Sequence, residues 1–166
     1  MTDNFVPESR PQAELRFIAD VHLGRLAKYL RMCGFDTLFQ QDYDDREIIE
    51  LSAKEGRIIL TRDKDLLRSK KVRQGHLVHS DAPLEQIREI LDVCRAAERI
   101  RPFTRCMECN GVMEHVGKEE IIDRLMPLTR DYYDEFKRCG TCGRIYWEGS
   151  HFARMKTFIM DLKSGK

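Results

Sequence analysis

Arg57-Ile-Ile-Leu-Thr-Arg-Asp-Lys-Asp65 joins an apolar run to a charged ending. The three residues from Ile58 to Leu60 are typical of a short strand that is buried on both faces. The run is followed by two acids, Asp63 and Asp65, spaced two residues apart. In an open α/β sheet, ligands bind in the crevice beyond the carboxyl ends of the strands, so acids at this position face a ligand.

Short apolar runs alternate with helical patterns on both sides of this segment. The expected strands span about residues 15–19, 35–39, 58–60 and 76–79, and the expected helices about 23–33, 45–55 and 84–94. Strands that alternate with helices at this spacing form right-handed βαβ units around a parallel sheet. The predicted fold class is therefore α/β, with a mainly parallel, doubly wound sheet that is flanked by helices.

The alternating pattern lapses near residue 100, where we expect a domain boundary. From Cys106 onward the spacing is set by cysteines, and an apolar helical face returns after Gly149-Ser150. We expect three parts: a polar, disordered tail at 1–13, the α/β domain at 14–100, and a zinc ribbon with a C-terminal helix at 101–166.

Composition limits the classes of function. The chain of 166 residues carries a formal net charge of +1, which excludes a globally basic nucleic-acid binder and leaves nucleic-acid binding to local patches. No apolar run approaches the roughly 18 residues of a membrane span, and the first fourteen residues lack the apolar core of a signal peptide. We therefore expect a soluble, cytoplasmic protein with no membrane partner.

Four of the six cysteines form two Cys-x-x-Cys pairs, which is the most specific signal in the chain. These are Cys106 with Cys109, and Cys139 with Cys142. Four thiolates complete the tetrahedral shell of Zn²⁺ and leave no open position, so the predicted zinc site is structural. The other two cysteines, Cys33 and Cys94, lie on apolar helix faces and are expected in the core.

Acidic residues follow the predicted strands or begin the helix between them. They are Asp20, Asp45, Asp63 and Asp65. If the strands are neighbours, these carboxylates meet in one crevice, and oxygen ligands of this kind select Mg²⁺ or Mn²⁺. Helix capping is the alternative interpretation for single members, namely for Asp20, for Asp65 and for Asp44 with Glu47 three residues later. Caps do not require two acids at one strand end, so the combination favours a metal site.

Basic residues lie next to these acids in the sequence. The first predicted helix carries Arg25, Lys28 and Arg31 on the side opposite its apolar face, and Arg62 directly precedes Asp63. Such a helix side is either a solvated face or a set of phosphate contacts. Its position just after Asp20 favours phosphate contact by Arg25 and Lys28, and Arg62 is expected either to contact phosphate or to neutralise the acids.

The motifs, taken in order, resemble a known family. They are Phe17-Ile-Ala-Asp20, Leu23-Gly-Arg-Leu-Ala-Lys-Tyr-Leu-Arg31, Gly34-Phe-Asp36, Asp45-Arg-Glu-Ile48, Glu55-Gly-Arg-Ile-Ile-Leu-Thr-Arg-Asp63 and, after the two cysteine pairs, Arg144-Ile-Tyr-Trp-Glu-Gly-Ser-His151. This series is similar to the Mut-seven C-terminal RNase family, whose members are described as PIN-like nuclease domains with a zinc ribbon.

The resemblance implies a fold, a substrate class and a set of ligands. It implies a PIN-like domain in which Asp20, Asp45, Asp63 and Asp65 bind the divalent metal, with Glu47 as a variable member. It also implies RNA as the substrate, and it is compatible with a homodimer because PIN-like domains often act as dimers.

Three functions follow from these observations. The leading hypothesis is a Mg²⁺- or Mn²⁺-dependent ribonuclease. The second is a non-catalytic RNA-binding or ribosome-associated module, suggested by the ribbon and by the arginines between Arg95 and Arg105. The third, phosphoryl transfer through an aspartyl phosphate, is disfavoured because His22 stands where a haloacid-dehalogenase-like site has its second acid, and the adjacent acids of a receiver are missing.

Overall fold

A four-stranded parallel sheet forms the centre of the α/β part of the protein. A computed structural model describes residues 14–165, so the tail predicted at 1–13 lies outside the described residues. The strands are β1 (Arg16–Ala19), β2 (Asp36–Leu38), β3 (Ile58–Thr61) and β4 (Gly75–Leu77). Their order is β2-β1-β3-β4, and all neighbours are parallel. The chain therefore reverses its winding direction between β1 and β3.

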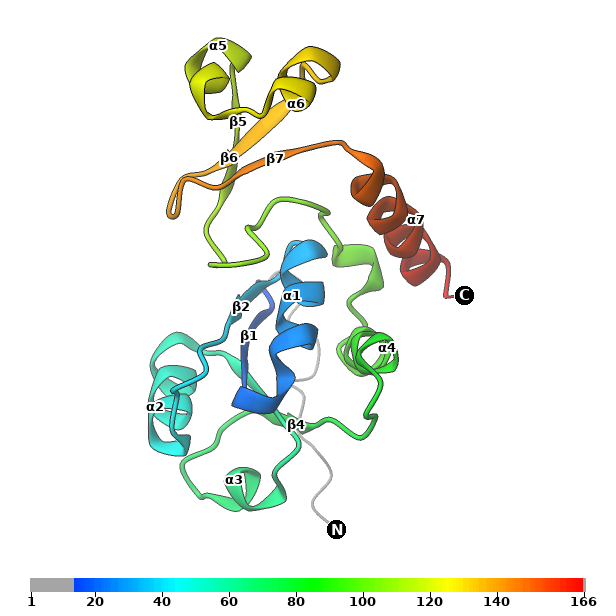
Figure 1. Ribbon diagram of the computed structural model, residues 1–166. Helices are drawn as coiled ribbons and strands as arrows, with labels where there is room; N and C mark the ends of the chain where they lie inside the picture. The colour runs from blue at the N-terminus through cyan, green and yellow to red at the C-terminus, as the bar shows by residue number, and fades with distance from the viewer. Residues whose placement is uncertain (1–13, 166) are drawn as a thin grey trace.

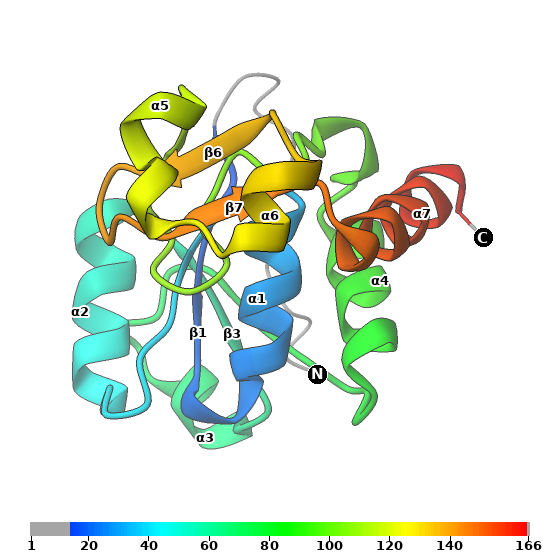
Figure 2. The same ribbon diagram turned by 45° about the horizontal axis from the view of Figure 1, so that its top comes forward.

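Helices cover both faces of this sheet (Figure 2). They are η1 (Val21–Leu23), α1 (Gly24–Met32), α2 (Asp45–Glu55), α3 (Lys64–Arg68), α4 (Pro83–Val93) and η2 (Ala97–Arg99). Helices α1 and α4 cover one face, and α2 and α3 cover the other. Because each helix runs back against its strand, α1, α2 and α3 all begin at the edge formed by the carboxyl ends of the strands (Figure 2).

Each face of the sheet has its own apolar core, because side chains alternate along a strand. Phe17 and Leu60 point to the α1 and α4 side, and Ile18 and Ile59 point to the α2 side. All four are fully buried, and burial of such a side chain contributes about 1.5–3 kcal/mol. The strands are thus buried on both faces, as the apolar run at 58–60 predicted, and the α/β class with a mainly parallel sheet is confirmed.

A small antiparallel sheet forms the centre of the C-terminal part. Its strands are β5 (Met113–Val116), β6 (Phe136–Cys139) and β7 (Ile145–Trp147), in the order β5-β6-β7. Between β5 and β6 lie α5 (Lys118–Ile121), η3 (Ile122–Arg124) and α6 (Pro127–Tyr132). The last helix, α7 (Ser150–Ser164), leaves this ribbon and packs Ile159 and Leu162 into the core beside α1 and α4 (Figure 1). The boundaries of the three proposed parts stay a prediction.

The ribbon contacts the side of the parallel sheet where its strands begin, opposite the side where the strands end and the acids lie. The side chain of Arg31, at the end of α1, donates to the backbone carbonyls of Met107 and Glu108 at 3.1 and 2.8 Å. Arg31 is 4% exposed, so the prediction that it lies on the solvent-exposed side of the first helix was wrong. Burial lowers the pKa of Arg31, and the anionic groups around it oppose that effect. Arg31 anchors the ribbon and is not a phosphate contact.

A buried ion pair within the parallel-sheet part lies next to the same junction. Asp36, the first residue of β2, contacts Arg57 at 2.7 Å and accepts a hydrogen bond from the side-chain amide of Asn110 at 2.7 Å. Asn110, which has a left-handed φ of 69°, directly follows Cys109, and its side-chain oxygen accepts from the backbone of Thr37 at 2.9 Å. Asn adopts this conformation at low cost. The position of the cysteine loop is thus coupled to the parallel sheet.

None of the helices within residues 14–165 combines the length and the apolar character needed to span a membrane.

Candidate active site and metal centre

Asp20 and Asp63 lie at the carboxyl ends of the two central strands and are linked through Thr61. The Thr61 hydroxyl donates to Asp20 Oδ2 at 2.6 Å and accepts from the backbone N–H of Asp63 at 2.9 Å. The other Asp20 oxygen, Oδ1, accepts from the backbone N–H of His22 at 3.0 Å. Asp20 therefore caps η1 as one interpretation predicted, and its carboxylate is held in a single orientation at the point where the winding reverses.

The carboxylate of Asp20 is buried without a cationic partner. Asp20 is 6% exposed, and no lysine, arginine or histidine of the described residues forms an ion pair with it or with Asp63. Aspartate is rarely this buried unless it is paired or bound to a metal. The neutral donors from Thr61 and His22 occupy only part of its acceptor capacity. The site thus fits a cation bound at Asp20.

Asp45 and Asp65 lie at the same edge but point to solvent. Asp45 is the first residue of α2 and is exposed. Asp65 is also exposed, and it contacts Arg68 at 2.6 Å on the surface of α3. The residue that caps α3 is Asp63, whose Oδ1 accepts from the Asp65 backbone at 2.7 Å, so the predicted capping role of Asp65 was wrong.

The capping box at the start of α2 engages Glu47. Asp44 accepts from the backbone of Glu47 at 2.8 Å, and the Glu47 carboxylate accepts from the backbone of Asp44 at 3.0 Å. Among residues 14–165, no set of three carboxylates around Asp20 brings its oxygens within 4.8 Å of one another. The acids share one edge of the sheet, and convergence of all four on one cation stays a prediction.

A polar groove of about 530 Å³ opens at η1, and none of the four predicted catalytic acids lines it. It runs along η1 and the first turns of α1, and it is lined by the three basic residues predicted to bind substrate, Arg25, Lys28 and Arg62. Lys28 contacts Glu108 of the ribbon at 2.9 Å, and Arg62 forms an exposed ion pair with Asp81. Surface pairs of this kind contribute less than about 1 kcal/mol, so a phosphate can displace either carboxylate at small cost.

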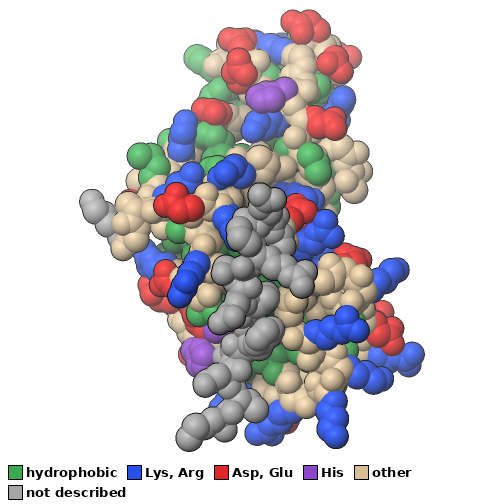
Figure 3. Space-filling model, turned by 180° about the vertical axis from the view of Figure 1, so that it is seen from behind, with side chains coloured by type: hydrophobic (Ala, Val, Ile, Leu, Met, Phe, Trp, Pro, Cys, Tyr) green, Lys and Arg blue, Asp and Glu red, His purple; other side chains and the backbone are tan. Residues whose placement is uncertain are grey.

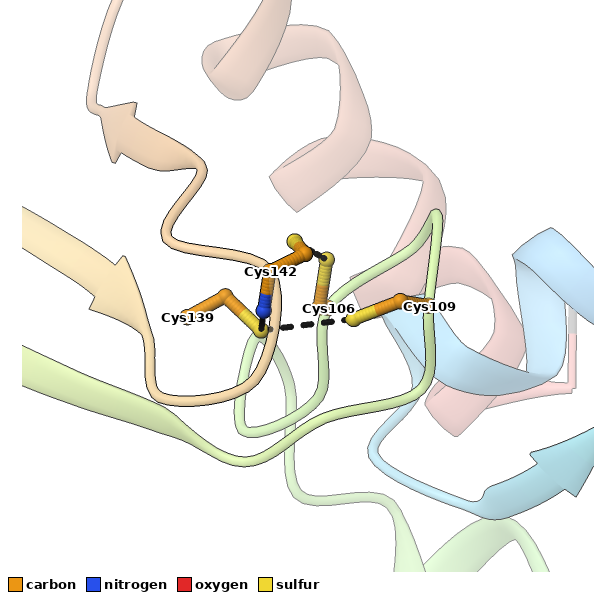
Figure 4. Close-up of side chains that lie close together, drawn as sticks. All are labelled: Cys106, Cys109, Cys139 and Cys142. Atoms are coloured by element: carbon orange, nitrogen blue, oxygen red, sulfur yellow. Dashed lines mark hydrogen bonds between the residues drawn. The ribbon is translucent and has the colours of Figure 1, made fainter.

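The four paired cysteines converge as predicted. Figure 4 shows their sulfur atoms facing one another from the loop after η2 and from the β6–β7 turn. The Sγ atoms all lie within 4.8 Å of one another, with separations of 3.4 Å between Cys109 and Cys139 and 3.8 Å between Cys106 and Cys142. A tetrahedral ion with Zn–S bonds of about 2.3 Å requires sulfur separations of about 3.8 Å. The donor set and its spacing therefore fit a structural zinc ion.

Local contacts affect these sulfurs unequally, and burial together with the neighbouring thiols raises the pKa of Cys109 to about 12. Burial alone would raise the pKa of Cys139, but backbone N–H groups of Cys142 and Thr141 and the neighbouring thiols lower it to about 7. The hydroxyl of Tyr146 lies 3.1 Å from the sulfur of Cys106. A side chain at Gly111 would place its Cβ 2.7 Å from the sulfur of Cys139, so only glycine fits there. His115 and His151 are not part of the cluster.

The ribbon also contains an aromatic pocket that the sequence patterns did not predict. This pocket of about 500 Å³ lies between the ribbon sheet and the start of α7, and Trp147, Tyr132, Tyr133 and Phe152 line it. Tyr132 is 76% and Trp147 40% exposed, whereas Phe152 packs on Phe103 with ring centroids 4.3 Å apart. Exposed aromatic rings of this kind stack on unpaired bases. The pocket joins residues from four separate segments, which explains why no local motif indicated it.

Comparison with known proteins agrees with this geometry. The family model of the Mut7-C RNAse domain matches residues 15–159, which include the parallel sheet, both cysteine pairs and most of α7. No curated protein and no solved structure gives a significant match. The match covers most of the chain and indicates a nuclease-type function. The protein therefore belongs to the Mut7-C RNAse domain family.

Proposed function

We propose that the protein hydrolyses RNA phosphodiester bonds with the help of Mg²⁺ or Mn²⁺ bound at the carboxyl edge of its parallel sheet. The observation that carries this proposal is the buried, ionically unpaired carboxylate of Asp20, which Thr61 links to Asp63. Oxygen donors without nitrogen or sulfur favour these hard cations. RNA as the substrate class rests on membership in the Mut7-C RNAse domain family.

The acids divide into an inner and an outer pair. Asp20, which is buried, and Asp63, which is exposed, follow the central strands and are proposed as the inner ligands. Asp45 and Asp65, also exposed, are proposed to complete the site from the starts of α2 and α3. The bound cation would activate water and neutralise charge on the phosphate during cleavage. The part of Thr61 is to hold the Asp20 carboxylate in one orientation through its 2.6 Å hydrogen bond.

Two groups of basic residues, one in the groove at η1 and one after α3, support binding of a polyanion. Arg25 lines the groove along η1, and it forms no ion pair with any residue of the described part of the chain. On the other side, the exposed residues Lys70, Lys71 and Arg73 follow α3. Seen from behind, Lys and Arg side chains gather at the end of the molecule where α3 lies (Figure 3). We propose that RNA phosphates contact both groups, and that bases reach the aromatic pocket of the ribbon.

Substitution of the inner acids tests the catalytic proposal. In zinc-loaded protein with Mn²⁺, Asp20→Asn and Asp63→Asn should each slow cleavage of single-stranded RNA by at least about 100-fold. Asparagine at position 20 keeps one acceptor oxygen for the hydrogen bond from His22 but places an amide NH2 where Oδ2 accepts from Thr61, so thermal unfolding is measured for each variant to check that it folds. Asp92→Asn, an exposed acid at the end of α4, is the matched control and should cleave at the wild-type rate. Wild-type rates for Asp20→Asn would reject the proposal.

A non-catalytic RNA-binding role is the second candidate. It is favoured by the absence, within residues 14–165, of three carboxylates that converge around Asp20. The arginines first associated with this role support it less, because Arg101 donates to the carbonyls of Glu98 and Ile100 and Arg105 donates to that of Asn110. This role predicts RNA binding that weakens as salt rises, without metal-dependent turnover, and a loss of affinity when Arg101 and Arg105 are removed.

A further inference from the structure

Two histidines and a glutamate converge beside β4, away from the cysteine cluster. His76 lies in β4, His79 follows it, and Glu89 projects from the middle of α4. Nε2 of His76 and Nδ1 of His79 lie 2.6 and 2.8 Å from the same oxygen, Oε1 of Glu89. The three potential ligand atoms all lie within 4.8 Å of one another. Neither the nuclease proposal nor the zinc ribbon uses these residues.

The cluster is closed on one side and open on the other. The side chain of His76 is 4% and that of Glu89 18% exposed, whereas that of His79 is 66% exposed. Burial opposes ionisation of Glu89, but hydrogen bonds from His79, His76 and the backbone outweigh it and lower its pKa. One ligand is thus buried, one is partly buried and one is exposed, so an ion can enter from solvent on the side of His79.

The other nitrogen of His76 is unpartnered. Its Nδ1 atom is buried and has no hydrogen-bond partner among the described residues. Ring nitrogens of a histidine are usually committed by the contact that the opposite nitrogen makes. Metal binding through Nε2 would place the proton on Nδ1, where no acceptor lies among the described residues, whereas the Nε2–H tautomer donates to Glu89.

We propose that His76, His79 and Glu89 form a second metal site, which binds a divalent transition-metal ion such as Zn²⁺. Two imidazole nitrogens and one carboxylate oxygen are the donor set that borderline cations prefer over Mg²⁺. Three protein ligands leave further coordination positions for water, on the side where His79 is exposed. The site goes beyond the nuclease proposal, because it neither shares a residue with the acidic edge nor depends on RNA.

The competing account is a purely structural one, in which Glu89 only ties the β4–α4 loop. The carboxylate also accepts from the backbone N–H groups of His79 and Ser80, at 3.1 and 3.4 Å. The backbone N–H of His79 also lies 3.1 Å from the other oxygen, Oε1, which faces both imidazoles as well. A purely structural contact between Glu89 and the β4–α4 loop therefore does not need both imidazole rings, whereas a metal site does.

Metal stoichiometry separates the two accounts. Tag-free protein, loaded with zinc and then desalted, should contain two equivalents of zinc, and His79→Ala should contain one. His79 is exposed, so its removal should leave the fold intact, and the cysteine site provides an internal count of one. His115→Ala, an exposed histidine of β5, and Glu85→Gln, an exposed acid in the first turn of α4, are matched controls and should both retain two.

Cobalt gives an independent signature of the same site. The first equivalent of Co²⁺ should show the intense thiolate charge-transfer bands of a four-cysteine site, and the second should add only weak visible bands that His79→Ala and Glu89→Gln abolish. A single equivalent in the wild type would overturn the proposal. Two equivalents retained by His79→Ala would overturn it as well.

Discussion

Loss of the Asp36 charge should destabilise the junction between the ribbon and the parallel sheet. Asp36→Asn keeps the size of the side chain but leaves Arg57 buried with less negative charge around it. The side chains of Arg57 and Asp36 are 6% and 11% exposed and lie 2.7 Å apart. Removal of one partner from a buried pair costs about 3–5 kcal/mol.

Because Arg57 keeps other contacts in Asp36→Asn, we expect a destabilisation near the lower end of this range. Its Nε still contacts Glu55 at 2.7 Å, and its Nη1 still donates to the carbonyl of Phe17 at 3.2 Å. We therefore expect a loss of about 3 kcal/mol in the free energy of unfolding. For a chain of this length, such a loss lowers the melting temperature by roughly 6 to 12 °C.

The stability difference between wild type and Asp36→Asn should also depend on pH in a defined direction. Burial would raise the pKa of Asp36, but Arg57 and Asn110 outweigh burial and lower it below its ordinary value of 3.8. A lowered folded-state pKa means that the carboxylate stabilises the fold above pH 3.8 and stops doing so as the pH falls through the folded-state value. The difference between wild type and Asp36→Asn should therefore be constant between neutral pH and about pH 5 and shrink in stronger acid.

Urea unfolding of the zinc-loaded protein measures this difference. Glu50→Gln is the matched control, because its ion pair with Arg46 is equally short at 2.8 Å but lies on the surface of α2. The control should lose less than about 1 kcal/mol. Equal losses for Asp36→Asn and Glu50→Gln would refute the claim that the buried pair stabilises the fold more than a surface pair does.

Three further predictions concern the ribbon and the groove. Chelation of zinc should abolish the dispersed NMR signals of β5 to β7 while those of β1 to β4 persist, because the parallel sheet has its own core; an unchanged ribbon spectrum would contradict a structural zinc. Trp147→Ala should weaken binding of single-stranded RNA by about 1–3 kcal/mol for a stacked base, whereas Met160→Ala, an exposed apolar control on α7, should not; fluorescence titration measures both. Arg25→Gln should reduce the salt slope of RNA binding by about 0.7, and Lys54→Gln, at the end of α2, should leave it unchanged.

The parallel sheet could be predicted because its signals are local. The central strands β1 and β3 contain short apolar runs. The observed start of β1 and both observed ends of β2 each differ from the predicted bounds by one residue. Leu15 and Phe35 caused two of these differences, since both are apolar and pack on the core but lie outside the hydrogen-bonded ladder. The cysteine site was predicted for the same reason, because its spacing is a local motif.

The ribbon strands could not be predicted, because their sequences carry no pattern. Two of the four residues of β5 are exposed, and its pairing with β6 depends on the turns that the cysteines hold together. The prediction for Arg31 was wrong for a related reason. Helical periodicity placed it away from the apolar face, but a loop 76 residues later covers that end of α1.

The candidate active site could be predicted from the sequence only in part. Placement of Asp20 and Asp63 at one edge followed from the rule that parallel strands end together, and their strands β1 and β3 are neighbours. The link through the Thr61 hydroxyl depends on side-chain orientation, which no pattern specifies. The convergence of His76 and His79 on Glu89 joins a strand to a helix, and the motif His-x-x-His alone did not indicate it.

The position of bound Mn²⁺ tests the central claim most directly. Crystals of the zinc-loaded protein, soaked in Mn²⁺ and measured at the manganese absorption edge, report where the ion binds. The nuclease proposal predicts anomalous density between the carboxylates of Asp20 and Asp63, with water at the remaining coordination positions, and no such density in Asp63→Asn. Absence of density at Asp20 in the wild type, with both carboxylates still engaged only as helix caps, would contradict it.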